Sequence, residues 1–167
     1  MPIEYADIPR DADERTTLLD FLEWQRATLA RKCEGLTADQ LRRRSAPPAT
    51  LSLLGLVRHL ADVERGWFRR TLAGEDAPDV FASEADPDGD FNNVDSADVE
   101  EAFAAWRDEC ERARRMVASR TLDDTGRQQT GRLVSLRWIL IHLIEEYSRH
   151  NGHADLLRQR IDGATGY

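Results

Sequence analysis

Apolar residues recur every three or four positions over four long stretches of the chain, and this spacing is typical of helices that bury one face. The stretches span residues 13–33, 52–72, 96–117 and 136–161. No stretch shows the regular alternation of apolar and polar residues that a competing strand would require. We therefore predict an all-α fold and, over residues 1–167, a single domain.

Capping residues and helix breakers mark the ends of these helices. N-caps are expected at Thr50 or Ser52, at Ser96 and at Ser135, and helix stops at Gly74 and Gly163. The sequence Thr37-Ala-Asp-Gln40 matches a capping box and predicts one further short helical turn. Pro47 and Pro48 then exclude helix, so a loop precedes the second long helix.

The connection between the second and third helices is long and acidic. Eleven Asp and Glu residues and no Lys or Arg lie between Thr71 and Trp106, so this part carries −11 while the whole chain carries −8. Residues 74–95 contain several Gly and Pro and little periodicity, which is typical of a crossover loop. We expect a solvated loop, with a lid over one end of the helices as the weaker alternative. Four helices joined in this way predict a four-helix bundle with a long acidic crossover loop between helices two and three.

Composition and charge exclude several classes of protein. With 41% hydrophobic and 32% charged residues over 167 positions, the chain can bury a core and is not disordered. The net charge of −8 argues against a nucleic-acid partner, which needs a basic surface. No apolar run reaches the roughly 18 residues of a membrane span, and the N-terminus lacks a signal pattern. Cys33 and Cys110 have no disulfide-framework spacing, which favours a reducing compartment. We therefore expect a cytoplasmic protein with no membrane partner.

Histidines fall on the predicted inner faces of two helices. His59 lies between Leu56 and Val63 in the apolar stripe of the second helix, so its ring should point inward. On the last helix, spacings of four, four and three residues align one polar row. The row contains His142, Glu146, His150 and His153. An inward carboxylate is costly unless a cation or a metal pairs with it.

These residues predict a metal site between the second and last helices. His59, Glu146 and His150 would supply three N and O ligands, a set that suits Zn²⁺ and other late divalent metals. Three protein ligands leave a position for water or a substrate atom, as in catalytic sites. The alternative from spacing alone is a structural role, with hydrogen-bonded histidines and with Glu146 paired to an arginine. Both interpretations stay open on these residues alone.

Two segments resemble the DinB-like four-helix metalloprotein superfamily. One is Leu56-Val-Arg-His59-Leu-Ala-Asp-Val-Glu-Arg-Gly-Trp67-Phe, and the other runs from Glu145-Glu-Tyr-Ser-Arg-His150 through Asn-Gly-His153 to Gly163. The resemblance covers nearly the whole chain and is closest to the uncharacterised actinobacterial branch near the mycothiol-dependent maleylpyruvate isomerases and mycothiol S-transferases. Members commonly bind a divalent metal through one His of the second helix and two residues four apart on the last helix, in most branches both His. Here Glu146 takes the place of one His, as it does in the maleylpyruvate isomerase branch.

This resemblance implies thiol chemistry at a metal. It implies a divalent metal, with Zn²⁺ or Ni²⁺ favoured, on His59, Glu146 and His150, and a low-molecular-weight thiol such as mycothiol as cosubstrate. A metal next to a thiol lowers the thiol pKa and so stabilises the nucleophilic thiolate. The expected activity is S-transfer to a small electrophile that the sequence does not identify, and the relatives suggest a homodimer. The alternative is a non-catalytic protein in which the polar row is structural or binds metal only to stabilise the fold.

Other candidate residues have structural interpretations. His142 is expected to hydrogen-bond to a metal ligand, with a role as a ligand itself as the alternative, and His153 to orient a ligand or to pair with Asp155 or Asp62. Packing or surface roles are expected for Tyr147, Arg149, Cys33, Cys110, Trp24, Trp67, Trp106 and Trp138.

Overall fold

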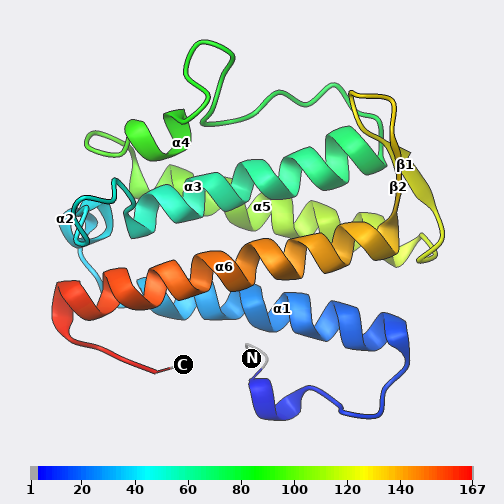
Figure 1. Cartoon of the computed structure of the whole chain (residues 1–167), viewed down its shortest axis with the longest axis horizontal. Helices are drawn as coiled ribbons and strands as arrows, with labels where there is room; N and C mark the ends of the chain where they lie inside the picture. The colour runs from blue at the N-terminus through cyan, green and yellow to red at the C-terminus, as the bar shows by residue number, and fades with distance from the viewer. Residues whose placement is uncertain (1–3, 167) are drawn as a thin grey trace.

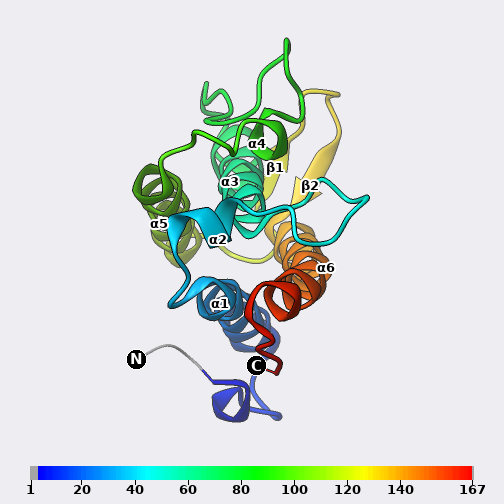
Figure 2. The same ribbon diagram turned by 90° about the vertical axis from the view of Figure 1, so that its left-hand side faces the viewer.

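Most of the chain is helical, as the apolar spacing predicts. The computed structural model describes residues 4–166. Its elements are η1 (Tyr5–Asp7), α1 (Glu14–Cys33), α2 (Ala38–Arg42), α3 (Leu53–Glu64), η2 (Arg65–Leu72), α4 (Gly89–Asn92), α5 (Val99–Ala118), β1 (Thr125–Arg127), β2 (Leu133–Ser135) and α6 (Leu136–Asp162). The long helices α1, α3, α5 and α6 lie side by side (Figures 1 and 2). Helix α1 packs on α6, α3 packs on α5, and α3 also contacts α6.

The facing sides of the long helices bury the predicted apolar stripes. The fully buried leucines include Leu22 and Leu29 of α1, Leu53, Leu56 and Leu60 of α3, and Leu136, Leu140 and Leu143 of α6. Helix α5 contributes smaller side chains at Ala102, Cys110 and Ala113. Small residues allow α5 to approach α3 closely, since less side-chain volume separates the two backbones.

Most predicted helix ends are confirmed. The Ser52 hydroxyl accepts the N–H of Gly55 at 3.1 Å, the capping box at Thr37 is present, and Gly163 ends α6 with a φ of 81°. The predicted N-cap at Ser96 is wrong. Asp98 is the cap of α5, because its carboxylate accepts the N–H groups of Glu100 and Glu101 at 2.8 and 3.2 Å.

The second predicted helix changes its winding partway along. Helix α3 ends at Glu64, and η2 continues it as a π-helix to Leu72. The last turn shows the wider winding, because the N–H of Ala73 bonds to the carbonyl of Phe68, five residues earlier, at 3.0 Å. Buried Glu64, Phe68 and Leu72 recur every four residues. Residues four apart lie on nearly the same face of a helix, so all three side chains point into the core.

A small antiparallel hairpin corrects the expectation that no strand is present. In it β1 pairs with β2, and Gly126 lies opposite Val134. Strands of three residues are too short to show an alternating pattern in the sequence. Gly126 also packs directly on η2, where a Cβ atom would lie only 2.1 Å from the carbonyl oxygen of Thr71. The chain turns back between β1 and β2, and β1 contacts the π-helix at Gly126.

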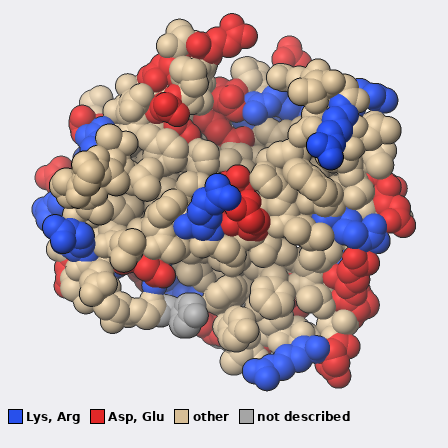
Figure 3. Space-filling model, viewed as in Figure 1, with Lys and Arg blue, Asp and Glu red and all other residues tan. Residues whose placement is uncertain are grey.

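The acidic connection between η2 and α5 is more ordered than a solvated loop. The Asp62 carboxylate accepts the backbone N–H groups of residues 80–82 at 2.6, 3.0 and 3.1 Å. The short helix α4 follows, and its Gly89 and Asp90 are buried. The carboxylates of this connection gather along one edge of the molecule (Figure 3). Within residues 4–166, no helix has the length and apolar character needed to cross a bilayer.

A buried ion pair joins α1 to α3 and was not predicted. The guanidinium of Arg26 donates to both carboxylate oxygens of Glu64, from Nε at 2.7 Å and from Nη2 at 2.6 Å. Tyr147 of α6 donates its hydroxyl proton to the same carboxylate at 2.8 Å, and Trp106 of α5 donates to the Tyr147 oxygen at 2.8 Å. All four long helices therefore meet at one polar cluster inside the core.

Candidate metal centre

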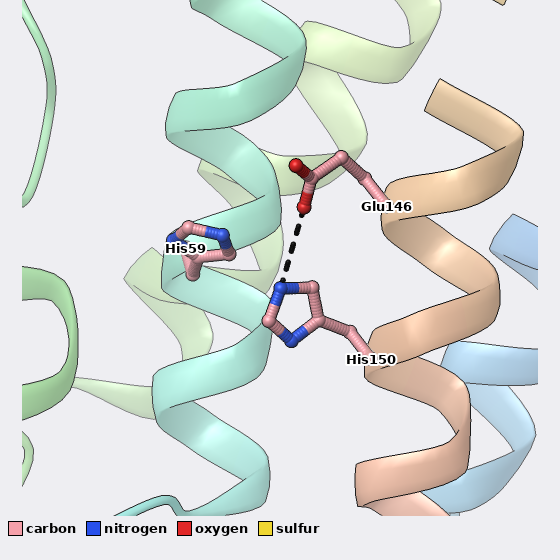
Figure 4. Close-up of side chains that lie close together, drawn as sticks. All are labelled: His59, Glu146 and His150. Carbon is pink, nitrogen blue, oxygen red and sulfur yellow. Dashed lines mark ion pairs between the residues drawn. The ribbon is translucent and has the colours of Figure 1, made fainter. Parts of the chain in front are cut away.

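The structure brings the three predicted ligands together between α3 and α6. His59 projects from α3, and Glu146 and His150 project from successive turns of α6 (Figure 4). One potential ligand atom from each residue lies within 4.8 Å of the other two. The Nε2 atom of His150 lies 3.4 Å from Oε2 of Glu146, and the rings of His59 and His150 have centroids 4.7 Å apart. The ion-pair partners of Glu146 are His142 and His150. The alternative, in which Glu146 pairs with an arginine, is therefore wrong.

The donor atoms of this group fit a divalent metal. Ligands about 2.0–2.1 Å from a tetrahedral ion lie about 3.4 Å from one another, which matches the separation of His150 and Glu146. The pKa of His150 is lowered to about 4, first by burial and then by the nearby His59 and His153. At neutral pH its imidazole is therefore uncharged, which is the form that binds metals. Two imidazoles and one carboxylate are a donor set that suits Zn²⁺ and its neighbours.

His59 is held from the side opposite Glu146 and His150. Its Nδ1 lies 2.8 Å from Oδ2 of Asp90, and the ring of Phe91 stacks on the imidazole at a centroid distance of 4.9 Å. Both residues belong to α4 in the acidic connection. Asp90 could not be singled out from the sequence, because it is one of eleven acidic residues between Thr71 and Trp106 and no local signal separates it from the others.

The two remaining histidines of α6 flank the ligands. His142 lies 3.6 Å from Oε1 of Glu146 through Nε2, and its ring stacks on Trp138. His153 lies 3.4 Å from His150, with the two Nδ1 atoms facing each other. The structure thus places His153 beside a predicted ligand. The alternative partners considered for it are engaged elsewhere, since Asp155 pairs with Lys32 and Asp62 binds the backbone of residues 80–82.

A polar cavity of about 460 Å³ adjoins His59. Its walls come from α3 and η2, from the acidic connection and from the hairpin turn at residues 127–130. The charged groups in the walls are the side chains of Asp62, Asp79, Asp90, Arg70 and Arg127. Two of these groups, Arg70 and Asp79, pair with each other at 2.5 Å. Three carboxylates and two guanidinium groups line this space, so its lining carries one excess negative charge. We call it the site cavity.

Neither cysteine is placed to act as a nucleophile. Cys33 and Cys110 are both buried, as expected. Burial raises the pKa of the Cys33 thiol to about 12, and burial followed by the charge of Glu64 raises the pKa of Cys110 further. A thiol with so high a pKa is not ionised at neutral pH and is a poor nucleophile.

The other side chains considered from the sequence have structural surroundings. Tyr147 is buried and bonds to Glu64, and Arg149 forms a surface ion pair with Glu145. Trp106 is buried in the core, whereas Trp138 is 43% exposed and lies against Trp67.

The fold and the site define a class of protein: a helical protein with a candidate three-residue metal centre between two long helices and a polar cavity beside it. The model of the family described as Mycothiol-S-transferase matches residues 17–163. The chain therefore belongs to the Mycothiol-S-transferase family, and its resemblance to the DinB-like mycothiol transferases is confirmed. No curated protein was found that matches it.

Proposed function

We propose that this protein is a divalent-metal-dependent thiol transferase that joins a low-molecular-weight thiol, such as mycothiol, to a small electrophile. His59, Glu146 and His150 would hold the metal, with Zn²⁺ or Ni²⁺ favoured. The observation that carries the proposal is the convergence of these three ligands from two helices, where His59 also lines the site cavity. Membership of the Mycothiol-S-transferase family supports the choice of thiol.

The chain's own groups suit this chemistry. When bound, a divalent metal would stabilise a thiolate, which is the nucleophilic form of the cosubstrate. His150 remains uncharged at neutral pH and can serve as a ligand without first losing a proton. Because both cysteines are buried with raised pKa values, the sulfur nucleophile would come from the cosubstrate. In the transfer a carbon–sulfur bond forms, the leaving group departs with its electron pair, and the thiol proton passes to solvent.

The setting of this site is also part of the proposal. The four long helices would be a DinB-type four-helix bundle with an acidic crossover, and residues 1–167 would form one domain. We place the protein in the cytoplasm, where a low-molecular-weight thiol is kept reduced. A homodimer remains an expectation from the resemblance.

Metal analysis of tag-free protein tests the proposal. We expect about one divalent ion per chain in the wild type and little in Glu146→Gln, which removes the carboxylate charge but keeps the shape. The matched control is Asp155→Asn, since Asp155 is an exposed carboxylate of the same helix that pairs with Lys32 and lies outside the candidate metal centre. Equal metal content in wild type and Glu146→Gln, after incubation with Zn²⁺ or Ni²⁺, would contradict the proposed ligand set.

Addition of mycothiol to the Co²⁺-substituted protein separates catalysis from a purely structural metal. A thiol that reaches an open coordination position changes the cobalt absorption spectrum, and the same thiol should be consumed when an alkyl halide is added. A spectrum that mycothiol leaves unchanged would favour the alternative of a closed, structural metal site.

A further inference from the structure

The carboxylate of Asp90 reaches the candidate metal centre from outside the four long helices. Asp90 is buried in α4, and its two oxygens have separate partners. Oδ1 accepts the N–H of Phe91 at 2.8 Å, and Oδ2 lies 2.8 Å from Nδ1 of His59. The stacked ring of Phe91 covers one face of the same imidazole.

Contacts with α3 hold α4 in place. Arg58, which precedes His59, donates to the carbonyl oxygens of Asn93 at 2.7 Å and Gly89 at 3.0 Å. Gly89 packs so tightly that a Cβ atom would lie 2.7 Å from the carbonyl of Phe81. The backbone is therefore hydrogen-bonded to Arg58 both before and after Asp90. Because Arg58 is next to His59 in α3, these bonds also fix the position of the Asp90 carboxylate relative to His59.

A carboxylate at this place determines which nitrogen of His59 carries the proton. A neutral imidazole has one N–H, and an ionised carboxylate can only accept a hydrogen bond. The contact therefore requires the proton on Nδ1, which leaves the lone pair on Nε2. In Figure 4 one ring nitrogen of His59 faces Glu146 and His150, and since Nδ1 is bonded to Asp90, that nitrogen is Nε2.

We propose that Asp90 is a positioning residue that fixes the Nδ1–H tautomer and the ring orientation of His59, so that Nε2 is presented to a metal shared with Glu146 and His150. The consequence for metal affinity rests on the proposed function. Hydrogen-bond partners of this kind typically contribute about 10- to 100-fold to metal affinity. The acidic connection would thus orient a metal ligand through Asp90, a role that its composition alone does not indicate.

The tautomer is tested in the metal-free wild-type protein, where no metal chemistry is involved. Two-bond ¹H–¹⁵N correlation spectra distinguish Nδ1–H from Nε2–H in each histidine, with His59→Gln used to assign the signal. We expect the Nδ1–H form for His59, and a shift toward the other tautomer in Asp90→Asn, because the amide group can donate to Nδ1. A wild-type His59 in the Nε2–H form would overturn the proposal.

Co²⁺ affinity tests the consequence. We expect Asp90→Asn to bind Co²⁺ about 10- to 100-fold more weakly than wild type. Asp88→Asn is the matched control, because Asp88 is an exposed carboxylate two residues away and its loss changes the net charge equally. Equal weakening in both variants would overturn the proposal, since it would indicate a long-range charge effect.

A double-mutant cycle separates positioning from general damage to the fold. In a His59→Ala background, Asp90→Asn should weaken Co²⁺ binding no further, because its effect passes through His59. An equal loss in both backgrounds would contradict this role. Absence of Co²⁺ binding in the wild type would refute the proposed function, and the tautomer measurement would then decide the inference about Asp90 on its own.

Discussion

Replacing Glu64 by Gln should destabilise the protein strongly, although the change adds no volume. Gln keeps an oxygen that can accept the Tyr147 hydroxyl, so the substitution removes mainly the negative charge. Arg26, whose side chain is 4% exposed, would then lose the charge that it meets through two hydrogen bonds. Burial is the largest single effect and lowers the pKa of Arg26, but the charge and hydrogen bonds of Glu64, acting together with the other neighbouring groups, raise that pKa well above its ordinary value.

The magnitude follows from this geometry. Removing one partner of a buried ion pair costs about 3–5 kcal/mol, because the remaining charge is left uncompensated. Arg26 also pairs with the half-buried Glu23 at 2.6 Å, so we expect the lower end, about 3 kcal/mol. For a domain of this size, such a loss lowers the Tm by about 6–12 °C.

Urea unfolding followed by circular dichroism measures this loss. The matched control is Glu111→Gln, which removes a carboxylate that pairs with Arg114 and Arg115 at the surface and should change the stability by less than about 0.5 kcal/mol. Replacing both members of the buried pair with apolar residues should recover part of the loss, since no unpaired charge remains. A loss for Glu64→Gln as small as that of the control, with an unchanged dependence on urea, would refute the reasoning.

Three further predictions concern packing, thiol reactivity and specificity. Gly126→Ala should destabilise the protein by more than about 1 kcal/mol, because its Cβ would lie 2.1 Å from the backbone of η2, whereas Gly152→Ala, in the open on α6, should be neutral or stabilising; thermal melts compare the two. Cys33 should resist iodoacetamide at pH 8 in the folded protein and react after unfolding, and rapid labelling of native protein, read by mass spectrometry, would contradict its burial and its raised pKa of about 12. In the metal-free protein, an uncharged ligand should bind in the site cavity better than one that bears carboxylates, because the cavity has an excess of negative charge; equal displacement of a bound reporter at low salt would argue against this electrostatic selection.

Periodicity in the sequence was sufficient for the long helices and for the placement of Glu146 and His150 on one face of α6. Leu22, Leu29, Leu56 and Leu60 are buried as their spacing indicated. A helix returns to the same face every three or four residues, so residues four apart on α6 must be neighbours whatever surrounds them. The residues around His59 and His150 carried the resemblance to the DinB-like mycothiol transferases, and the match to the Mycothiol-S-transferase family confirms it.

Short elements and single caps could not be derived in the same way. Three-residue strands such as Thr125–Arg127 carry no period, and their pairing depends on a partner elsewhere in the chain. Ser96 and Asp98 are both suitable N-cap residues. Which of them caps α5 depends on the backbone conformation of the segment before the helix.

Only the tertiary structure decided what surrounds the candidate site. The separation of His59 from Glu146 and His150 depends on how α3 packs on α6, and the position of Asp90 depends on where the acidic connection returns to α3. The burial of Arg26 with Glu64 likewise requires α1 and α3 to meet. Sequence patterns record contacts within one helix, because those repeat with the helical period. Contacts between segments far apart in the chain have no such period, and the packing of the core determines them.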